Sequence, residues 1–283
     1  MKISIRHQLS FAVGHGSAHA VQHILLTPLD GPTQKVLEWS IALDGMEKAA
    51  RFYDAFGNSA QLVSQVRPQD DLVVTVEGVV ETVDRHGVVG RLPRDPMPAL
   101  FRRITPLTPS DLAIHEPLRD DAKQGSNRIA LLHRLMGRIG ELYGVGADEE
   151  DAQHTPVQIQ SQSQSNGSGQ SQEQATDARP EADATTVAHA FIGACRALDI
   201  PARFVTGYLA ESEDGPAAFH AWAEAHDDGL GWIGFDCMLG ICPTDRHVRV
   251  ASGLDALSCA PVRTVPDLGA PQAQGLSVEA AAQ

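Results

Sequence analysis

Apolar and polar side chains alternate over the first eleven residues of the chain. Ile3, Ile5, Leu9 and Phe11 fall on one face of an extended segment, and the residues between them are polar. This period of two predicts a β-strand with one buried face. Strand-like segments follow at residues 24–27, 37–43, 61–66 and 72–83, separated by turn-rich stretches. The spacing predicts an antiparallel β-sandwich or barrel over about the first 90 residues.

A helical period replaces this alternation further along the chain. Ser126 precedes apolar residues at helical spacing between Ile129 and Leu142, and Gly144 stands where a helix is expected to stop. Together these residues predict an amphipathic helix with Ser126 as its cap.

A second apolar stripe runs from Val187 through Phe191 and Cys195 to Leu198, which predicts another helix with one buried face. Strands are predicted after it at residues 202–210, 219–225 and 232–237. The pattern as a whole predicts an α+β protein: an antiparallel β-sandwich followed by a mixed core.

A Gln/Ser-rich stretch interrupts the second half. Residues 158–173 carry one apolar side chain, Ile159, and therefore cannot repay the entropy of ordering. We expect a disordered insertion at about 155–182. The predicted organisation is a β-rich domain over 1–92, a core over 93–265 and a short tail over 266–283.

Charge and composition exclude several classes of protein. The net charge of −14 repels phosphate backbones and anionic lipids, so neither nucleic acid nor a membrane surface is an expected partner. No apolar run reaches the length of a membrane span, and the N-terminus does not resemble a secretory signal. Four cysteines, at 195, 237, 242 and 259, are too few for a disulfide framework. A cytoplasmic location with reduced thiols is predicted.

Metal and cofactor sites are not expected either. Cys237 and Cys242 lack the second ligand pair that a zinc site needs. His15, His19 and His23 recur every four residues, but Gly14 and Gly16 argue against a helix there, so these are interpreted as scattered loop histidines.

One predicted hairpin could carry chemistry. A three-residue loop over Asp227, Asp228 and Gly229 would place His220 opposite Asp236, with the side chains on one face of the sheet. A carboxylate beside an imidazole can fix its tautomer for base catalysis. On spacing alone, a cross-strand contact with no catalytic task is the stronger interpretation.

A family resemblance changes that weighting. The segment HAFIGACRALDIPARFVTGYL at 189–209, with HAWAE at 220–224, GWIGFD at 231–236 and GICPTDR at 240–246, resembles the core of bacterial transglutaminase-like proteins, which share a papain-like fold. RFYDAFGN at 51–58 and LTP at 26–28 resemble the β-rich domain that precedes this core. The resemblance covers nearly the whole chain apart from the Gln/Ser insertion and the last dozen or so residues.

The resemblance implies a Cys–His–Asp site. Active members use a thiolate at a helix start to attack a carboxamide, a histidine as base and then acid, and an aspartate that orients the histidine. His220 and Asp236 match two of these positions. The nucleophile position, counted back from His189, is occupied by Ala184, and the residues after it differ from the family pattern as well.

Substitute nucleophiles are few. Thr185 and Thr186 lie next to the nucleophile position, whereas Cys195 is about 16 Å further along the same helix. Cys237 is expected to point away from the site because it follows Asp236 on a strand.

Three functions stay open at this point. The leading hypothesis is an inactive pseudoenzyme that binds a peptide or protein amide or regulates an active homologue. The alternative is an amide hydrolase or acyl transferase that uses Thr185 or Thr186, and the third is a structural or interaction protein with a closed cleft. The sequence does not predict an oligomeric state.

Overall fold

The computed structural model describes residues 1–12, 19–66, 71–124, 127–146, 182–212, 215–269 and 272–280. The predicted insertion over 155–182 lies outside these residues apart from Ala182, and so do Ser126 and His15.

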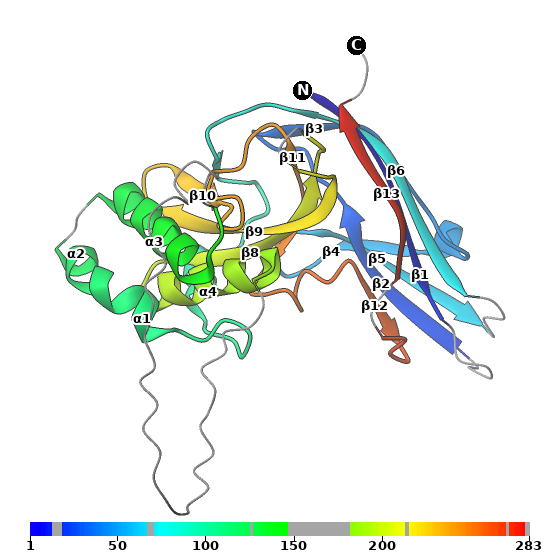
Figure 1. The fold of residues 1–283 in the computed structure, drawn as a ribbon. Coiled ribbons are helices and arrows are strands. Elements are labelled where there is room, and N and C mark those ends of the chain that lie inside the picture. The colour runs from blue at the N-terminus through cyan, green and yellow to red at the C-terminus, as the bar shows by residue number, and fades with distance from the viewer. Residues whose placement is uncertain are drawn as a thin grey trace, which may run out of the picture.

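The N-terminal part is an antiparallel β-sandwich, as predicted (Figure 1). One four-stranded sheet has the order β13-β1-β6-β3, and the other has the order β12-β2-β5-β4. The strands are β1 (Lys2–Phe11), β2 (His19–Thr27), β3 (Gln34–Ala42), β4 (Ala50–Tyr53), β5 (Ser59–Val66), β6 (Leu72–Thr82), β12 (Val262–Val265) and β13 (Gln272–Ala280). A short 3-10 helix, η1 (Met46–Lys48), joins β3 to β4.

Alternation in the sequence produces the buried face of this sandwich. Ile3, Ile5, Leu9 and Phe11 of β1 are all at most 4% exposed. Leu9 and Phe11 pack with Ile24 of β2 from the opposite sheet, which closes the sandwich core. Burying this apolar face stabilises the fold at about 25 cal/mol per Å² of apolar area removed from water.

The second part is a five-stranded sheet covered by helices, with the order β11-β8-β9-β10-β7. Its strands are β7 (Val88–Gly90), β8 (Ala202–Leu209), β9 (Ala218–Asp227), β10 (Gly231–Phe235) and β11 (His247–Gly253). The helices are η2 (Pro98–Arg102), α1 (Leu112–His115), η3 (Glu116–Leu118), α2 (Arg119–Lys123), α3 (Arg128–Tyr143) and α4 (Ala184–Ala197).

Helix α4 forms the centre of this part. Its apolar stripe, which includes Phe191 and Cys195, packs with α3 and with β9 and β10 in one large core cluster. The predicted stop of α3 at Gly144 is confirmed, because this glycine adopts a left-handed φ of 67°. The cap of α3 is Asn127, whose side-chain oxygen accepts hydrogen bonds from the backbone N–H groups of Ile129 and Ala130.

The register of the β9–β10 hairpin differs from the prediction by two residues. Trp232 pairs with His226, not with Glu224, and the loop consists of residues 228–230. Asp227 closes this loop by accepting the N–H groups of Gly229 and Leu230, and the left-handed glycine is Gly231, not Gly229. A shift of two residues leaves every side chain on its predicted face, because the strand period is two.

The predicted domain boundaries also need correction. Residues 262–265 and 272–280 return to the sandwich as β12 and β13, so the predicted tail over 266–283 contains an edge strand that pairs with β1. Strand β7 lies before residue 92 yet pairs with β10 of the core sheet. Pairing between distant segments of the chain caused both differences, and local sequence pattern carries no signal for it.

The two parts are joined by polar and apolar contacts. Asn58 of the sandwich exchanges two hydrogen bonds of 2.8 Å with the backbone of Ser252, and Gln34 does the same with Arg249. We call these pairs the amide clamps, because each carboxamide imitates the N–H and C=O of a neighbouring strand. An apolar cluster that includes Ile5 and Tyr208 continues the interface.

None of the helices in the described ranges is long and apolar enough to cross a membrane. The cytoplasmic location stays a prediction.

Candidate active site

His220 and Asp236 come together at one end of strands β9 and β10 in the five-stranded sheet. His220 lies on β9, and Asp236 follows directly after β10, where it forms a bridge with Ile241. The Nε2 atom of His220 lies 2.6 Å from Oδ2 of Asp236, and both side chains are buried. The predicted contact is therefore present, although the two residues meet diagonally across the hairpin and not as directly opposed partners.

Asp236 is held as a carboxylate by four donors. Its Oδ1 atom accepts hydrogen bonds from the backbone N–H groups of Met238 and Leu239, and its Oδ2 atom contacts His220 and His247. Burial alone would raise the pKa of Asp236, but the hydrogen bonds from the two histidines outweigh it and lower this pKa to about 2. The carboxylate therefore stays charged across the physiological range.

His247 is a site residue that the sequence analysis missed. Its Nε2 atom lies 3.1 Å from Oδ2 of Asp236, and its Nδ1 atom accepts a hydrogen bond from the N–H of Thr244. Because Nδ1 acts as an acceptor, the proton of a neutral His247 must sit on Nε2 and point at Asp236. Only the sequence position after GICPTDR hints at His247, and no spacing rule links it to the His220 hairpin.

The same three side chains place one possible metal-ligand atom each within 4.8 Å of one another. A metal bound to Nε2 of His247 would require the proton on Nδ1, where the N–H of Thr244 already points. Both oxygens of Asp236 also serve as acceptors for donors within the chain. This donor set fits a chain of hydrogen bonds better than it fits a metal ion.

The chemistry of His220 follows from its partner. Since Asp236 is ionised, the neutral imidazole of His220 carries its proton on Nε2 and a lone pair on Nδ1. Within the described residues, Nδ1 forms no hydrogen bond of its own. The imidazole is thus oriented to accept a proton or a hydrogen bond at Nδ1.

Ala184 is the first residue of α4. The carboxylate of Asp183 caps the helix by accepting the N–H of Thr186 at 2.6 Å. Ala184 packs against the core cluster that also contains Ala221 and Cys237, the chain neighbours of His220 and Asp236. Ala184 is half-buried, so its methyl group takes part in the packing of α4 against this cluster.

Thr185 and Thr186 occupy other faces of the helix. At about 100° per residue, Thr186 lies roughly 200° around the axis from Ala184, and Thr185 lies roughly 100° around it. The buried face of α4 is defined by Val187, Ala188 and Phe191, all of which lie within about 60° of Ala184.

The four thiols are not poised for catalysis. Cys195, Cys237 and Cys259 are fully buried, and burial raises the pKa of each thiol. Cys242 is partly buried, and its pKa is also raised by burial. Cys237 belongs to the apolar core cluster, in line with the expectation that it points away from the site.

The N-terminal histidines do not form a site in the described residues. His19 and His23 lie on strand β2, not in a loop as predicted. The Nδ1 atom of His23 instead lies 3.3 Å from a guanidinium nitrogen of Arg263.

A buried charge cluster beside the site was also missed. Glu224, four residues after His220 on β9, accepts hydrogen bonds from Arg203 at 2.6 Å and from Arg249 at 2.8 Å. Arg203 also contacts Asp95 and lies 4.0 Å over the ring of Trp232. Burial would raise the pKa of Glu224, but the two arginines lower it below its usual value.

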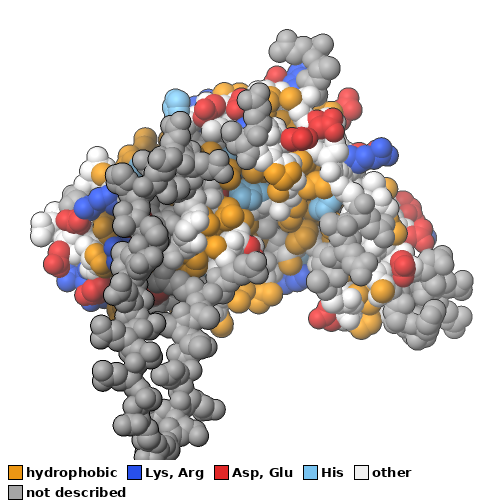
Figure 2. All heavy atoms as spheres, in the orientation of Figure 1, with side chains coloured by type: hydrophobic (Ala, Val, Ile, Leu, Met, Phe, Trp, Pro, Cys, Tyr) orange, Lys and Arg blue, Asp and Glu red, His pale blue; other side chains and the backbone are white. Residues whose placement is uncertain are grey.

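On the face drawn in Figure 2, hydrophobic and histidine side chains gather in the middle, between the helical part and the sandwich. Charged side chains lie mainly towards the periphery of this face. The described surface around the centre is thus less charged than the net charge of the chain suggests.

Two family profiles match the chain. The Bacterial transglutaminase-like N-terminal region matches residues 3–81, and the Transglutaminase-like superfamily matches residues 148–237, a range that contains Ala184, His220 and Asp236. No curated protein matches significantly.

Solved structures agree with the fold. A protein from Cytophaga hutchinsonii described as a "putative cysteine protease" is 18% identical, with a TM-score of 0.59 over 99% of this chain and 89% of that one. The periplasmic domain of TgpA from Pseudomonas aeruginosa, bound to ethylmercury, is 14% identical over 84% of this chain and 90% of that one. Its TM-score is 0.34, too low to support a common fold. At these identities the likeness concerns the fold alone. The two profile matches, which follow each other along the chain, identify it as a bacterial transglutaminase-like protein, with the family's N-terminal region followed by a transglutaminase-like core.

Proposed function

We propose that this protein is a catalytically inactive transglutaminase-like protein that binds a peptide or protein carboxamide. The observation that carries the proposal is Ala184 at the first position of α4, on the helix face that packs against the core. Thioester formation begins with attack by a sulfur lone pair, and a methyl group has none to offer.

The four thiols of the chain do not compensate. A nucleophilic cysteine needs a lowered pKa and access to substrate, whereas three of these thiols are fully buried and all four have raised pKa values. Thr185 and Thr186 lie outside the buried face of α4. Neither hydroxyl group forms a hydrogen bond with a basic side chain in the described residues.

The groups that remain suit the binding of an amide. His220 offers a lone pair on Nδ1, which can accept an amide N–H. The N–H groups of Ala184 and Thr185 have no acceptor in the described part of the chain, and a helix N-terminus favours a carbonyl oxygen there. The chain thus offers an acceptor on β9 and donors at the start of α4, which are the two kinds of group that a carboxamide needs, and we propose that one amide bridges them.

The first test is turnover. The full chain, incubated with a glutamine-containing peptide and a primary amine, should release no ammonia and form no cross-linked product. Turnover that disappears in the His220→Ala variant would sink the proposal. An electrophilic probe that labels Thr185 or Thr186 in a mass spectrum would have the same effect, because it would identify a working hydroxyl nucleophile.

The second test is binding. Calorimetric titration should detect the glutamine peptide and lose most of the heat in His220→Ala. His133→Ala is a matched control, because His133 is exposed on α3 and is not part of the Asp236 network. A peptide in which norleucine replaces glutamine should bind more weakly to the unaltered protein. Equal binding of the two peptides would contradict amide recognition.

A further inference from the structure

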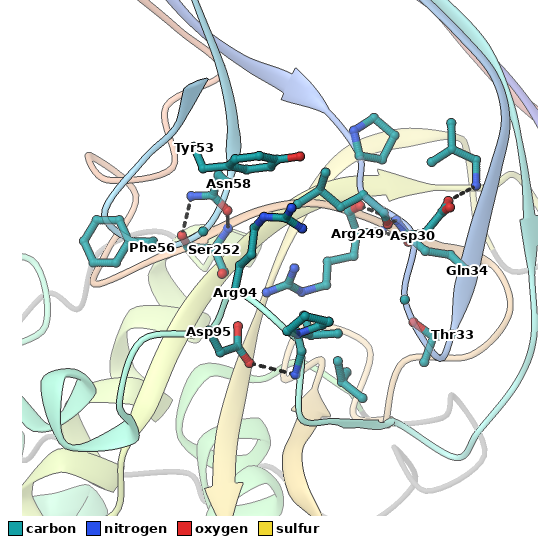
Figure 3. A pocket seen from close by; sticks show the side chains of 18 residues that line it. Asp30, Thr33, Gln34, Tyr53, Phe56, Asn58, Arg94, Asp95, Arg249 and Ser252 are labelled. Atoms are coloured by element: carbon teal, nitrogen blue, oxygen red, sulfur yellow. Dashed lines mark hydrogen bonds between the residues drawn. The ribbon is translucent and has the colours of Figure 1, made fainter. Parts of the chain in front are cut away.

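A cavity lies between the sandwich and the core sheet, and its lining does not include His220 or Asp236. It has a volume of about 390 Å³. Its walls come from the β2–β3 connection, the segment after β4, residues 89–95 and strand β11. Figure 3 shows the two amide clamps at its border, Gln34 with the Arg249 backbone and Asn58 with Ser252. These clamps fix the walls before any ligand arrives, which reduces the ordering cost of binding.

Two guanidinium groups reach into this cavity. Arg249 donates from Nε to Glu224, but its Nη2 atom is buried without a hydrogen-bond partner in the described residues. Arg94 stacks its guanidinium over the ring of Tyr53 at 4.1 Å and forms no ion pair within the described part of the chain. Figure 3 shows both side chains extending into the same part of the pocket, next to Tyr53.

The cavity wall contains two carboxylates. Asp95 is paired with Arg203 and also accepts the backbone N–H of Leu92, whereas Asp30 is exposed and accepts the N–H of Val36. In the described residues neither carboxylate is bonded to Arg94 or to Nη2 of Arg249, so these two groups remain available as donors. A buried donor without a partner is costly and calls for a bound group.

Another part of the wall is apolar or aromatic and includes Val36, Val89, Leu92 and Phe56, while Thr33 and Ser252 add hydroxyl groups. An inorganic anion would leave these side chains against water, whereas an organic acid would cover them. The planar fork of arginine matches the two oxygens of a carboxylate. The net charge of −14 repels anions in general. Binding of an anion in this cavity therefore depends on the local arginine side chains.

We infer that this cavity binds a carboxylate with a small apolar or aromatic body, either a free organic acid or the C-terminus of a peptide. Arg94 and Arg249 hold the carboxylate, while Tyr53 and the aliphatic wall hold the body. This site is separate from the proposed amide site, and neither proposal depends on the other.

Calorimetric titration of the full chain with phenylacetate tests the inference, with phenylacetamide as the neutral control. We expect saturable binding of the acid and at least about tenfold weaker binding of the amide, because a charge-assisted pair is lost. The tripeptide Ala-Ala-Phe, with a free or an amidated C-terminus, distinguishes a peptide C-terminus from a small organic acid as the ligand. If the ligand is a peptide C-terminus, the tripeptide with the free carboxylate should bind more tightly than phenylacetate. If the ligand is a small organic acid, phenylacetate should bind more tightly.

Arg94→Gln should weaken phenylacetate binding about tenfold, and Arg94→Lys should weaken it less, since charge survives but the fork does not. Arg94 is exposed, so both variants are expected to fold. Arg51→Gln, an exposed arginine on β4 outside the cavity, is the matched control and should bind normally. His220→Ala should also bind normally. Equal affinity for acid and amide, no effect of Arg94→Gln, or no saturation up to about 10 mM would each overturn the inference.

Discussion

His247 donates from Nε2 to the same Asp236 oxygen that contacts His220, at 3.1 Å. One carboxylate oxygen thus joins two imidazoles, and the backbone N–H of Thr244 fixes the orientation of the second one. The His220–Asp236 pair is therefore not an isolated dyad but part of a buried network, and its stability and protonation can be measured without any substrate.

The pH dependence of stability should report the charge of Asp236. Its pKa is about 2 in the folded protein against 3.8 for the unperturbed group, so its stabilising effect is complete above about pH 4 to 5 and is lost as pH falls towards 2. The shift corresponds to about 2 kcal/mol. Urea unfolding of the unaltered protein and of Asp236→Asn, measured between pH 7 and pH 2.5, should show that the variant lacks this part of the acid dependence.

Asp228→Asn serves as the control, because the Asp228 side chain is 84% exposed where it contacts Arg128 and His226. It should leave the acid dependence nearly unchanged. An identical slope for the unaltered protein and Asp236→Asn would contradict the lowered pKa.

Histidine tautomers give a second prediction. The neutral forms of His220 and His247 should both carry their proton on Nε2, because each faces the ionised Asp236 through that atom. His189 provides an internal control with the opposite tautomer, since its Nε2 atom accepts the N–H of Ala256 at 3.0 Å. Its imidazole is kept neutral by burial, which lowers the pKa of His189.

Nitrogen-15 NMR of histidine-labelled protein distinguishes the two tautomers directly. A proton on Nδ1 of His247 would mean that the N–H of Thr244 does not point at this atom, and the argument against a metal ion would then fail.

Restoring a thiol should restore little activity. In Ala184→Cys the new sulfur follows Asp183, whose negative charge disfavours a thiolate. The Asp183 carboxylate also accepts the N–H of Thr186, so this N–H cannot stabilise the thiolate. The double variant Asp183→Asn/Ala184→Cys should have a thiol pKa lower by about half a unit to one unit than the single variant, because a neighbouring anion is removed.

The rate of alkylation by iodoacetamide as a function of pH measures this pKa, with the unaltered protein supplying the background of the four buried or half-buried thiols. Strong amidase activity in Ala184→Cys alone would show that the absence of a thiol at position 184 is all that prevents catalysis.

The buried Glu224 cluster should contribute far more to stability than a surface pair of similar length. Glu224→Gln leaves Arg203 and Arg249 without their shared carboxylate, which is expected to cost about 3–5 kcal/mol. The matched control is Glu77→Gln, which breaks an ion pair of 2.9 Å with Arg6 between side chains that are 51% and 76% exposed. Its cost should stay below about 1 kcal/mol.

Chemical denaturation of both variants at one pH provides the comparison. If Glu224→Gln and Glu77→Gln lowered the free energy of unfolding by the same amount, burial would not explain the contribution of the Glu224 cluster to stability.

Sequence patterning predicted many of the elements, because each of these depends on neighbours along the chain, but it missed β4, β7, β11, β12 and β13. The alternation of Ile3 and Ile5 defines the buried face of β1, and Gly144 ends α3 because a left-handed residue is needed there. The predicted cap was wrong by one residue, because Asn127 and not Ser126 supplies the capping oxygen.

The site was predicted in part for a similar reason. Because the strand period is two, His220 and Asp236 lie on one face both in the predicted register and in the observed register, which is shifted by two residues. The contact was therefore predicted correctly even though the register was wrong. The roles of Ala184, His220 and Asp236 in binding stay predictions.

The sequence by itself determined the alternating faces, the helix ends and the methyl group at position 184, because these depend on residue type and short-range geometry. Only the tertiary structure decided that His247 shares Asp236, that β13 closes the N-terminal sheet and that Arg94 and Arg249 meet across one cavity. The physical reason is that each of these contacts joins segments far apart in the chain, and their pairing follows from how whole sheets pack together.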